Sequence, residues 1–371
     1  MIRSVIIGCA HMHVNEVALY LDGQPESELC GIADVPPAEP EQTGKRYTRA
    51  WNFANVVEKY GARPYDDYRL MLDELKPDVA YLLCENGQKA EVAGEVARRG
   101  IDVIIEKPMA TTEEDAEKIV ALKAKYGVRV LVNWPVTWRK YVRSMKAAAD
   151  SGRFGRLIKM RYLNGHTGPL GKGARHRGVT EKAEDMTDAE RSRVWWYHSD
   201  RGGGAFYDIL CYGCYFARWL FGKVPEEIEA VAGNLNTPFG DVEDNLAALF
   251  RYDGAFAVAE GTWTTPRRRM PTGPELIFSE GVVWCDGVPD GEAFVAACDE
   301  YGQDVDLADF TGNSPEDDDF RNMPWQYAAV RLRGKPVHET LTAEFNADVI
   351  RMISAAIRSD RTHGAEKVAR K

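Results

Sequence analysis

The chain has 371 residues and a formal net charge of −10, and 44% of its residues are hydrophobic and 28% charged. This length predicts two domains, and this composition predicts a sizeable core and excludes a largely disordered chain. The acidic balance argues against a nucleic-acid partner, although backbone amides at helix N-termini still allow an anionic cofactor.

The seven cysteines are scattered and odd in number, as in proteins of a reducing compartment. The chain does not open on a basic segment followed by a long apolar one, so we expect no signal peptide. No window of about 18 uninterrupted apolar residues occurs, which argues against a membrane span. We expect a cytoplasmic protein.

The first 132 residues alternate short apolar runs with helical segments. Strands are predicted at 2–7, 28–33, 78–83, 102–105 and 128–132, and helices at 14–21, 51–60, 66–75, 88–99 and 112–126. Strands separated by helices of this length predict right-handed βαβ units and a parallel sheet. We therefore expect a doubly wound Rossmann domain over residues 1–132.

The period changes after residue 132. Alternating segments that predict longer strands with short connections lie at 155–163, 226–234, 244–252, 255–263 and 274–285. Helices are predicted over 204–220 and 339–359, and residues 360–371 should be a frayed tail. Residues 165–190 and 290–325 read as long loops that cover the site. Residues 133–371 thus predict an α+β domain with an antiparallel or mixed sheet.

A candidate phosphate-binding loop follows the first strand. Of the three glycines in the G-x-G-x-x-G fingerprint only Gly8 is present, while Ala10 and His13 occupy the other two places. Ala10 limits the approach of a pyrophosphate, and His13 must either push the helix off the strand or point its ring outward. Alone, this loop is compatible with an ordinary strand-to-helix turn.

Asp34 ends the second strand and favours the dinucleotide interpretation. A carboxylate there hydrogen-bonds the adenosine ribose and repels a 2′-phosphate, so it favours NAD over NADP. A helix cap is the alternative role for Asp34. Arg46 and Arg49 lie in the following segment and offer positive charge to a 2′-phosphate, so NADP stays open.

His11 and His13 are spaced like a metal pair, but no third ligand is apparent in the sequence. We expect no metal and assign both histidines to the cofactor loop.

Glu106-Lys107-Pro108 follows the predicted strand at 102–105. Ligands of open α/β sheets lie at the carboxyl ends of the strands, so a lysine there approaches a bound nicotinamide. Partial burial beside a positively charged ring should lower the pKa of Lys107 toward neutrality, as a proton shuttle requires. A surface lysine at a strand end is the alternative.

This tripeptide resembles the signature of the Gfo/Idh/MocA oxidoreductases. Further segments resemble that family at 66–68, 83–86, 150–157, 202–208 and 242–245, so the resemblance spans about residues 2–285. It implies an NAD(P)-dependent enzyme with a large open sheet in its second domain, commonly packed against a partner copy. It also implies that Cys84, Asn86 and Glu106 lie beside the cofactor.

The resemblance assigns substrate roles to the 204–220 helix. An aspartate at the place of Asp208 binds a substrate hydroxyl in the family, and a histidine four residues later assists proton transfer. Tyr212 stands at that place here, four residues on and so on the same helical face. Because the ordinary pKa of tyrosine is near 10, more of the proton transfer falls to Lys107. We interpret Cys211 and Cys214 on this helix as packing residues.

Four further residues are candidate substrate contacts, namely Asn133, Trp138, His166 and His198. Aromatic faces suit the C–H faces of sugars, although packing at a domain interface is the commoner role.

The sequence therefore predicts hydride transfer between NAD, or NADP, and a secondary hydroxyl of a sugar, cyclitol or related polyol. Lys107, Asp208 and Tyr212 are the expected catalytic residues, and the partners are a small molecule and further copies of the chain. Two alternatives remain: glycoside cleavage with retained NAD, and a cofactor-bound sensor without catalysis.

Overall fold

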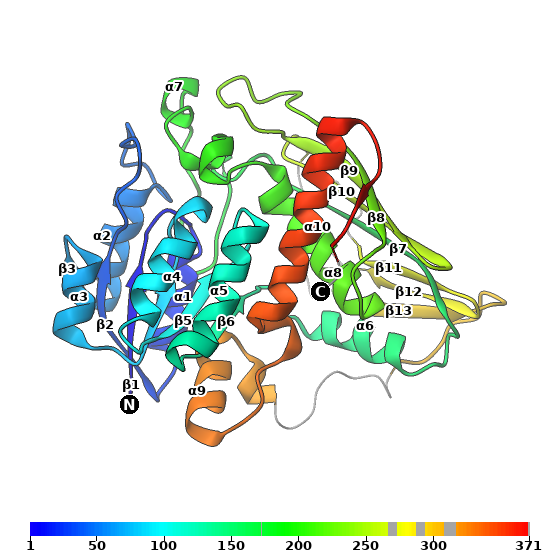
Figure 1. Cartoon of the computed structure of the whole chain (residues 1–371), viewed down its shortest axis with the longest axis horizontal. Helices are drawn as coiled ribbons and strands as arrows, with labels where there is room; N and C mark the ends of the chain where they lie inside the picture. The colour runs from blue at the N-terminus through cyan, green and yellow to red at the C-terminus, as the bar shows by residue number, and fades with distance from the viewer. Residues whose placement is uncertain (172, 266–272, 287–293, 308–316, 370–371) are drawn as a thin grey trace.

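A computed structural model describes residues 1–171, 173–265, 273–286, 294–307 and 317–369. Its N-terminal half contains a parallel sheet of six strands in the order β3-β2-β1-β4-β5-β6 (Figure 1). The strands are β1 (Ile2–Ile7), β2 (Ser27–Ala33), β3 (Arg63–Tyr65), β4 (Val79–Leu82), β5 (Asp102–Glu106) and β6 (Val130–Asn133). This is the predicted doubly wound dinucleotide-binding topology.

Alternate residues of each strand point to opposite faces of this sheet, and both faces are covered. One face packs against α1 (Val14–Asp22) and α2 (Arg49–Tyr60), and the other against α3 (Tyr68–Leu75), α4 (Lys89–Ala97) and α5 (Glu113–Tyr126). The predicted helix at 66–75 begins two residues late because Asp67 accepts a hydrogen bond from the Arg69 amide and caps α3. The short edge strand β3 was not predicted.

The second sheet has eight strands in the order β13-β12-β11-β7-β10-β9-β8-β14, and only its β7–β10 pair is parallel. The strands are β7 (Leu157–Gly165), β8 (Glu227–Gly233), β9 (Asn245–Tyr252), β10 (Ala255–Thr262), β11 (Glu275–Phe278), β12 (Gly281–Asp286), β13 (Phe294–Asp299) and β14 (Glu366–Lys367). The mainly antiparallel prediction is confirmed. One face of β10 is buried at Ala257 and Ala259, whereas Phe256 on the other face is exposed.

Several predictions in the C-terminal half were wrong. The single strand expected at 274–285 is a hairpin, β11 and β12, that turns at Ser279 and Glu280. The segment expected to be a loop at 290–325 contains β13 and the start of α9 (Met323–Arg333). Helix α6 (Lys140–Asp150) was also missed. Much of the 165–190 segment is irregular, as predicted, up to the short helix α7 (Asp188–Arg191).

The predicted helix at 204–220 has two parts, a π-helical turn at Phe206–Leu210 and α8 (Cys211–Phe221). The wider turn contains Asp208, and such turns are frequent at functional sites. Cys211 and Cys214 on α8 are fully buried and free, in accord with packing roles.

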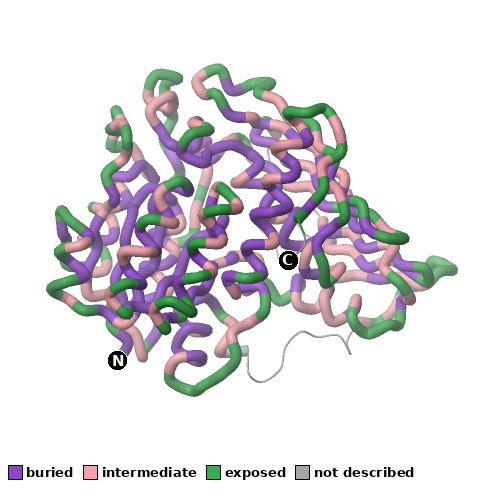
Figure 2. Tube along the Cα trace, in the orientation of Figure 1, coloured by how far each residue is buried: buried purple, intermediate pink, exposed green. Residues whose placement is uncertain are grey.

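Two C-terminal helices join the halves of the molecule. Helix α9 buries Met323 and Tyr327 against the face of the first sheet that α1 and α2 cover. Helix α10 (Ala343–Thr362) lies between α5 on one side and α8 and β8 on the other (Figure 1). The expected frayed tail was wrong for its first part, since α10 continues to Thr362 and β14 pairs with β8. Figure 2 shows the first sheet and α10 largely buried, whereas strands of the second sheet alternate between buried and more exposed residues.

None of the helices in the described part of the chain is both long enough and apolar enough to cross a membrane.

Candidate active site

The loop between β1 and α1 lies close against the end of β4. Gly8 adopts φ +93°, and a Cβ atom there would collide with the backbone nitrogen of Cys84. Cys84 is fully buried beneath this turn, and burial raises the pKa of its thiol to about 12. The carbonyl of Ala10 accepts a 2.9 Å hydrogen bond from Trp195 Nε1. The tight turn after β1 therefore requires glycine at position 8, the role of the first glycine in the dinucleotide fingerprint.

His13 points its ring away from the helix–strand contact, the second of the two predicted possibilities. Its Nδ1 lies 3.0 Å from Oε1 of Glu106 at the end of β5. Burial alone lowers the pKa of His13, but the Glu106 carboxylate outweighs burial and raises it. His11 beside it is buried, and burial together with the charges of His13 and Lys107 lowers its pKa well below the ordinary value.

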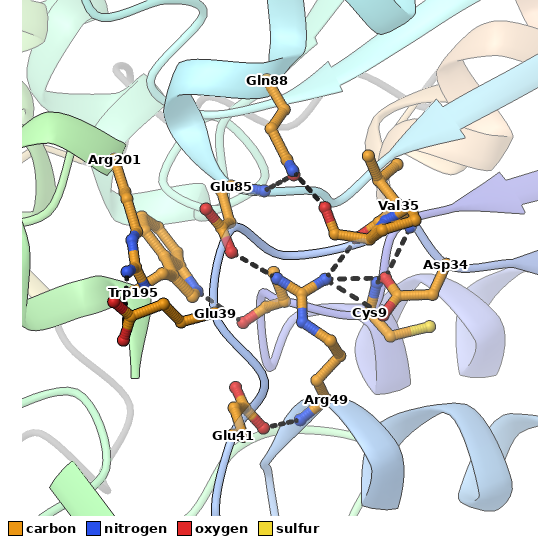
Figure 3. Close-up of polar contacts among 12 residues, drawn as sticks. Cys9, Asp34, Val35, Glu39, Glu41, Arg49, Glu85, Gln88, Trp195 and Arg201 are labelled. Carbon is orange, nitrogen blue, oxygen red and sulfur yellow. Dashed lines mark hydrogen bonds and ion pairs between the residues drawn. The ribbon is translucent and has the colours of Figure 1, made fainter. Parts of the chain in front are cut away.

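Asp34 anchors a buried charge cluster at the end of β2 (Figure 3). Its Oδ1 accepts a 2.7 Å hydrogen bond from the Cys9 amide and a 2.9 Å bond from Arg49 Nη1. Arg49 also donates to Glu85 Oε1 at 2.6 Å. The guanidinium of Arg49 is therefore paired with two carboxylates. Arg46 donates its backbone amide to Glu184 and its guanidinium to the Lys182 carbonyl, both on the 165–190 segment. Of the two arginines that the sequence left open for a 2′-phosphate, Arg49 is thus already paired with carboxylates.

Asn86 and Lys89 stabilise the end of β5 through buried hydrogen bonds. Asn86 Nδ2 donates to the Gly202 carbonyl at 2.8 Å, a contact between the two halves of the chain. The fully buried Lys89 donates to Asn86 Oδ1 and to the carbonyls of Glu106 and Pro108, on either side of Lys107. Burial lowers the pKa of Lys89 to about 8. The sequence analysis missed Lys89, which only its helical position next to Asn86 could have indicated.

Lys107 lies at the centre of the site. Its side chain is 2% exposed, and its Nζ is 3.3 Å from Asp208 Oδ1. Burial by itself lowers the pKa of Lys107, but the facing groups Tyr212, Cys211 and Asp208 raise it well above the ordinary value. These groups oppose the shift toward neutrality that the sequence predicts beside a bound nicotinamide, and that shift stays a prediction. The sequence did not show that Tyr212 and the Asp208 carboxylate lie so close to the ammonium group.

Asp208 contacts three polar side chains of the site. Its Oδ2 accepts from Trp263 Nε1 at 2.9 Å and lies 3.0 Å from His166 Nε2. Burial raises the pKa of Asp208, but the Lys107 ammonium and the bonds from His166 and Trp263 outweigh burial and hold it well below its usual range. His166 was predicted to contact substrate, and the structure places it against Asp208. Trp263 was not predicted because it follows β10, more than 50 residues after Asp208 in the sequence.

Tyr212 lies under the ammonium group, which is 4.6 Å from the centre of its ring. Burial raises its pKa further, so its hydroxyl stays protonated at neutral pH. The substitution of tyrosine for histidine thus supplies an aromatic face to Lys107.

Glu106 connects two of the predicted substrate contacts to the cofactor loop. Its Oε2 accepts a 2.8 Å hydrogen bond from Asn133 Nδ2, and Asn133 Oδ1 accepts from Trp138 Nε1 at 3.2 Å. His198, in contrast, is bonded to the Ser192 carbonyl at 2.7 Å and joins none of these contacts.

The 165–190 segment crosses from the second domain to the first. Tyr47 donates to the Glu181 carbonyl at 2.7 Å, and Lys59 donates to that of Gly178 at 2.9 Å. His176 on this segment packs edge-on against the rings of Tyr47 and His13. The segment therefore covers the cofactor loop, as expected, and brings a histidine that the sequence analysis did not assign.

Residues 2–134 match a family described as "Oxidoreductase family, NAD-binding Rossmann fold", and residues 142–283 match the "GFO/IDH/MocA C-terminal domain". Among curated proteins, a dTDP-3,4-didehydro-2,6-dideoxy-alpha-D-glucose 3-reductase of Actinomadura kijaniata is 24% identical over 62% of this chain and 59% of that protein. The rhizopine catabolism protein MocA of Rhizobium meliloti is 22% identical over 55% and 61%. The chain thus spans about six-tenths of the length of these relatives.

Solved structures share the whole fold. A putative oxidoreductase from Thermotoga maritima has a TM-score of 0.74 at 18% identity, with 99% of this chain and 100% of that chain covered. The WlbA dehydrogenase from Bordetella pertussis, in complex with NADH and UDP-GlcNAcA, has a TM-score of 0.73 at 22% identity, with 100% and 99% covered. The two family matches and the site described above show that this chain belongs to the NAD-binding Gfo/Idh/MocA oxidoreductase family.

Proposed function

We propose that this protein interconverts a secondary alcohol and a ketone on a sugar, cyclitol or related polyol, with NAD as the hydride carrier. The observation that carries the proposal is the buried pair of Lys107 Nζ and Asp208 Oδ1, 3.3 Å apart. A lysine from the end of β5 and an aspartate from the second domain meet where a substrate between the domains would contact both. The names of the relatives, which include inositol 2-dehydrogenases and a 1,5-anhydro-D-fructose reductase, support a polyol or sugar.

Bound nicotinamide supplies or accepts the hydride. Lys107 is charged at neutral pH and so is ready to give a proton to a ketone oxygen. In the oxidation direction it must first lose this proton before its neutral amine can accept that of the alcohol. Asp208 stays ionised, fixes the ammonium and accepts a hydrogen bond from a substrate hydroxyl. His166, bonded to Asp208 Oδ2, is the residue that we place nearest to the role of the missing histidine.

Asp34 supports NAD over NADP. Asp34 and Glu85 pair with the guanidinium of Arg49, and Glu41 accepts a hydrogen bond from the Arg49 backbone amide. This excess of carboxylates opposes a 2′-phosphate.

The decisive experiment replaces Lys107 with methionine, which keeps the length and removes the proton. General acid–base catalysis contributes about 100-fold or more, so we expect kcat with a panel of polyols and their ketones to fall at least about 100-fold. NADH binding, followed by its fluorescence, should persist.

Lys118→Met, at an exposed lysine of α5, is the matched control and should keep full activity. Full activity of the Lys107 variant would refute the assignment. Cofactor binding without turnover on any substrate would favour the sensor alternative, and release of an aglycone without net NADH would favour glycoside cleavage.

We further propose residues 1–132 and 133–371 as the two domains, and the cytoplasm as the location.

We also propose a homo-oligomer as the working form. The open face of the second sheet supports this proposal, since Val231 on β8 is 66% exposed and Leu235 just after β8 is 75% exposed. A second copy of the same sheet would cover them. Light scattering of Val231→Asp, compared with the unmodified protein, tests this.

A further inference from the structure

The absence of a metal was predicted because the pair His11 and His13 lacked a third ligand, and the structure removes this premise. Glu106, 93 residues after His13, reaches the pair from the end of β5. One ligand atom from each of these three residues lies within 4.8 Å of the other two, the one such group in the described part of the chain. We propose that His11, His13 and Glu106 bind a divalent first-row transition metal ion, of which Zn²⁺ is the type.

The spacing of the atoms suits a shared ion. Two ligands that each lie about 2.1 Å from a metal, at an angle of 90–110°, are separated by about 3.0–3.4 Å. His13 Nδ1 and Glu106 Oε1 are 3.0 Å apart. The same two atoms can therefore coordinate one ion without movement of the backbone, and two histidines with one carboxylate form a ligand set found in catalytic zinc sites.

The His11 ring supplies an independent observation. The residue is 2% exposed, and its Nε2 is buried with no hydrogen-bond partner. A buried polar atom without a partner is unfavourable unless something satisfies it. Nδ1 of the same ring accepts a 3.2 Å bond from the His13 amide. Coordination through Nε2 moves the ring proton to Nδ1 and breaks this one hydrogen bond, which is weaker than a metal–ligand bond.

Neighbouring groups hold the carboxylate and offer a fourth ligand. Asn133 Nδ2 bonds the second oxygen of Glu106 at 2.8 Å, which is how ligating carboxylates are oriented in metal sites. The His176 ring centre lies 6.5 Å from that of His13, and its Nε2 is also buried without a partner. A rotation of the His176 side chain, which lies outside the group of atoms within 4.8 Å of one another, or an oxygen of a polyol can complete the coordination.

The local charges limit the affinity. Lys89 and Lys107 place two ammonium groups near the triad, and the carboxylates of Glu106 and Asp208 balance them. A divalent ion therefore adds uncompensated charge, so we expect micromolar rather than picomolar binding. An ion beside Lys107 would polarise a substrate oxygen, but its binding requires neither NAD nor substrate.

The test titrates the chelator-treated full chain, free of cofactor, with Zn²⁺ by calorimetry and with Co²⁺ by visible absorption. We expect one ion per chain and a Co²⁺ band in the visible range. His13→Gln and Glu106→Gln should each weaken binding at least tenfold, with folding checked by circular dichroism. His363→Asn, at an exposed histidine, should leave binding unchanged.

Absence of stoichiometric Zn²⁺ binding to the unmodified protein overturns the proposal, whatever the variants do. Binding that persists unchanged in folded His13→Gln and Glu106→Gln also overturns it, because the ion then lies elsewhere. Since no step measures turnover, failure here leaves the hydride-transfer proposal standing, and failure of Lys107→Met to lose activity leaves the metal site standing.

Discussion

At the residue scale, the chemistry of the site depends on buried charges that are paired with one another. Lys107 and Asp208 are both buried, and each would be costly without the other. Trp263 and His166 bind the remaining oxygen of Asp208 and keep it ionised. The sequence predicted both members of the pair, but their mutual contact and its effect on the pKa of Lys107 required the fold.

Replacement of Asp208 by asparagine tests this pairing through acid stability. Its folded pKa lies below the unfolded value of about 4. The carboxylate therefore stabilises the fold fully above that pH, and this stabilisation is lost as the pH falls toward the folded pKa. We expect Asp208→Asn to lower the free energy of unfolding by about 3 kcal/mol at pH 7, and by less at pH 3.5.

Urea unfolding at pH 3.5, 5 and 7 measures this difference. Asp253→Asn, at an exposed turn, is the control and should match the unmodified protein throughout. A deficit of the same size at every pH would contradict the assignment.

At the scale of elements, strand ends and turns carry the functional groups. Helices and strands of the first domain followed from the apolar period, because strands buried on both faces leave continuous hydrophobic runs. The turn over Gly202, Gly203 and Gly204 could be located but not explained from sequence. Glu243, just before β9, fills the space beside Gly204 and accepts a 2.7 Å bond from the Phe206 amide at the start of the π-helical turn.

Glu243 should make stability depend on pH near neutrality. Burial raises its pKa to about 7 in the folded state. Between the unfolded value and pH 7 the native state binds the proton more tightly, so stability falls as the pH rises through this window. Glu243→Gln removes the effect, and from pH 5 to pH 8 the variant should gain on the unmodified protein by about 2 kcal/mol.

Thermal and urea unfolding at pH 5, 6, 7 and 8 provide the measurement. Glu229→Gln on β8 is exposed and serves as the control. Parallel stability curves for the Glu243 variant and the unmodified protein would show that this carboxyl titrates normally.

Asp34 at the end of β2 should set the cofactor preference. Asp34→Ser removes the group that repels a 2′-phosphate and leaves Arg49 paired with Glu85 alone. The ratio of kcat/KM for NAD to that for NADP should fall at least tenfold, equivalent to about 1.4 kcal/mol. Steady-state kinetics with both cofactors measure the ratio, and Asp22→Ser at the end of α1 should not change it. An unaltered ratio in Asp34→Ser would place selection elsewhere.

At the scale of the whole molecule, α10 holds the domains in the arrangement that brings Lys107 to Asp208. Asn346 on this helix accepts a 2.6 Å bond from Trp134 Nε1, just after β6, and donates to the carbonyls of Thr340 and Thr342. The helix was predicted from its amphipathic period, but nothing in that period showed which elements flank it.

Asn346→Ala should therefore weaken the contact between α10 and the residue that follows β6. It removes the side-chain partner of the buried Trp134 nitrogen and of the Thr340 carbonyl, at a cost of about 2–3 kcal/mol, while the Thr342 carbonyl keeps its bond from the Asn346 amide. Urea unfolding measures the loss, and kcat should drop with it because the two halves of the site separate more easily. Glu344→Ala, two residues earlier and on the exposed side of α10, is the control. Unchanged stability would show that the contact is dispensable.

The sequence alone determined the Rossmann half, the class of the second sheet and the positions of Gly8, Asp34, Lys107 and Asp208. These depend on local properties: the period of apolar residues, the conformational demand on a glycine, and short segments that resemble a family. The tertiary structure decided which of them meet. It placed α9 on the first sheet, His166 and Trp263 beside Asp208, and Glu106 beside the histidine pair. Contacts between residues far apart in the chain produce no periodic pattern in the local sequence, so the sequence alone could not predict them.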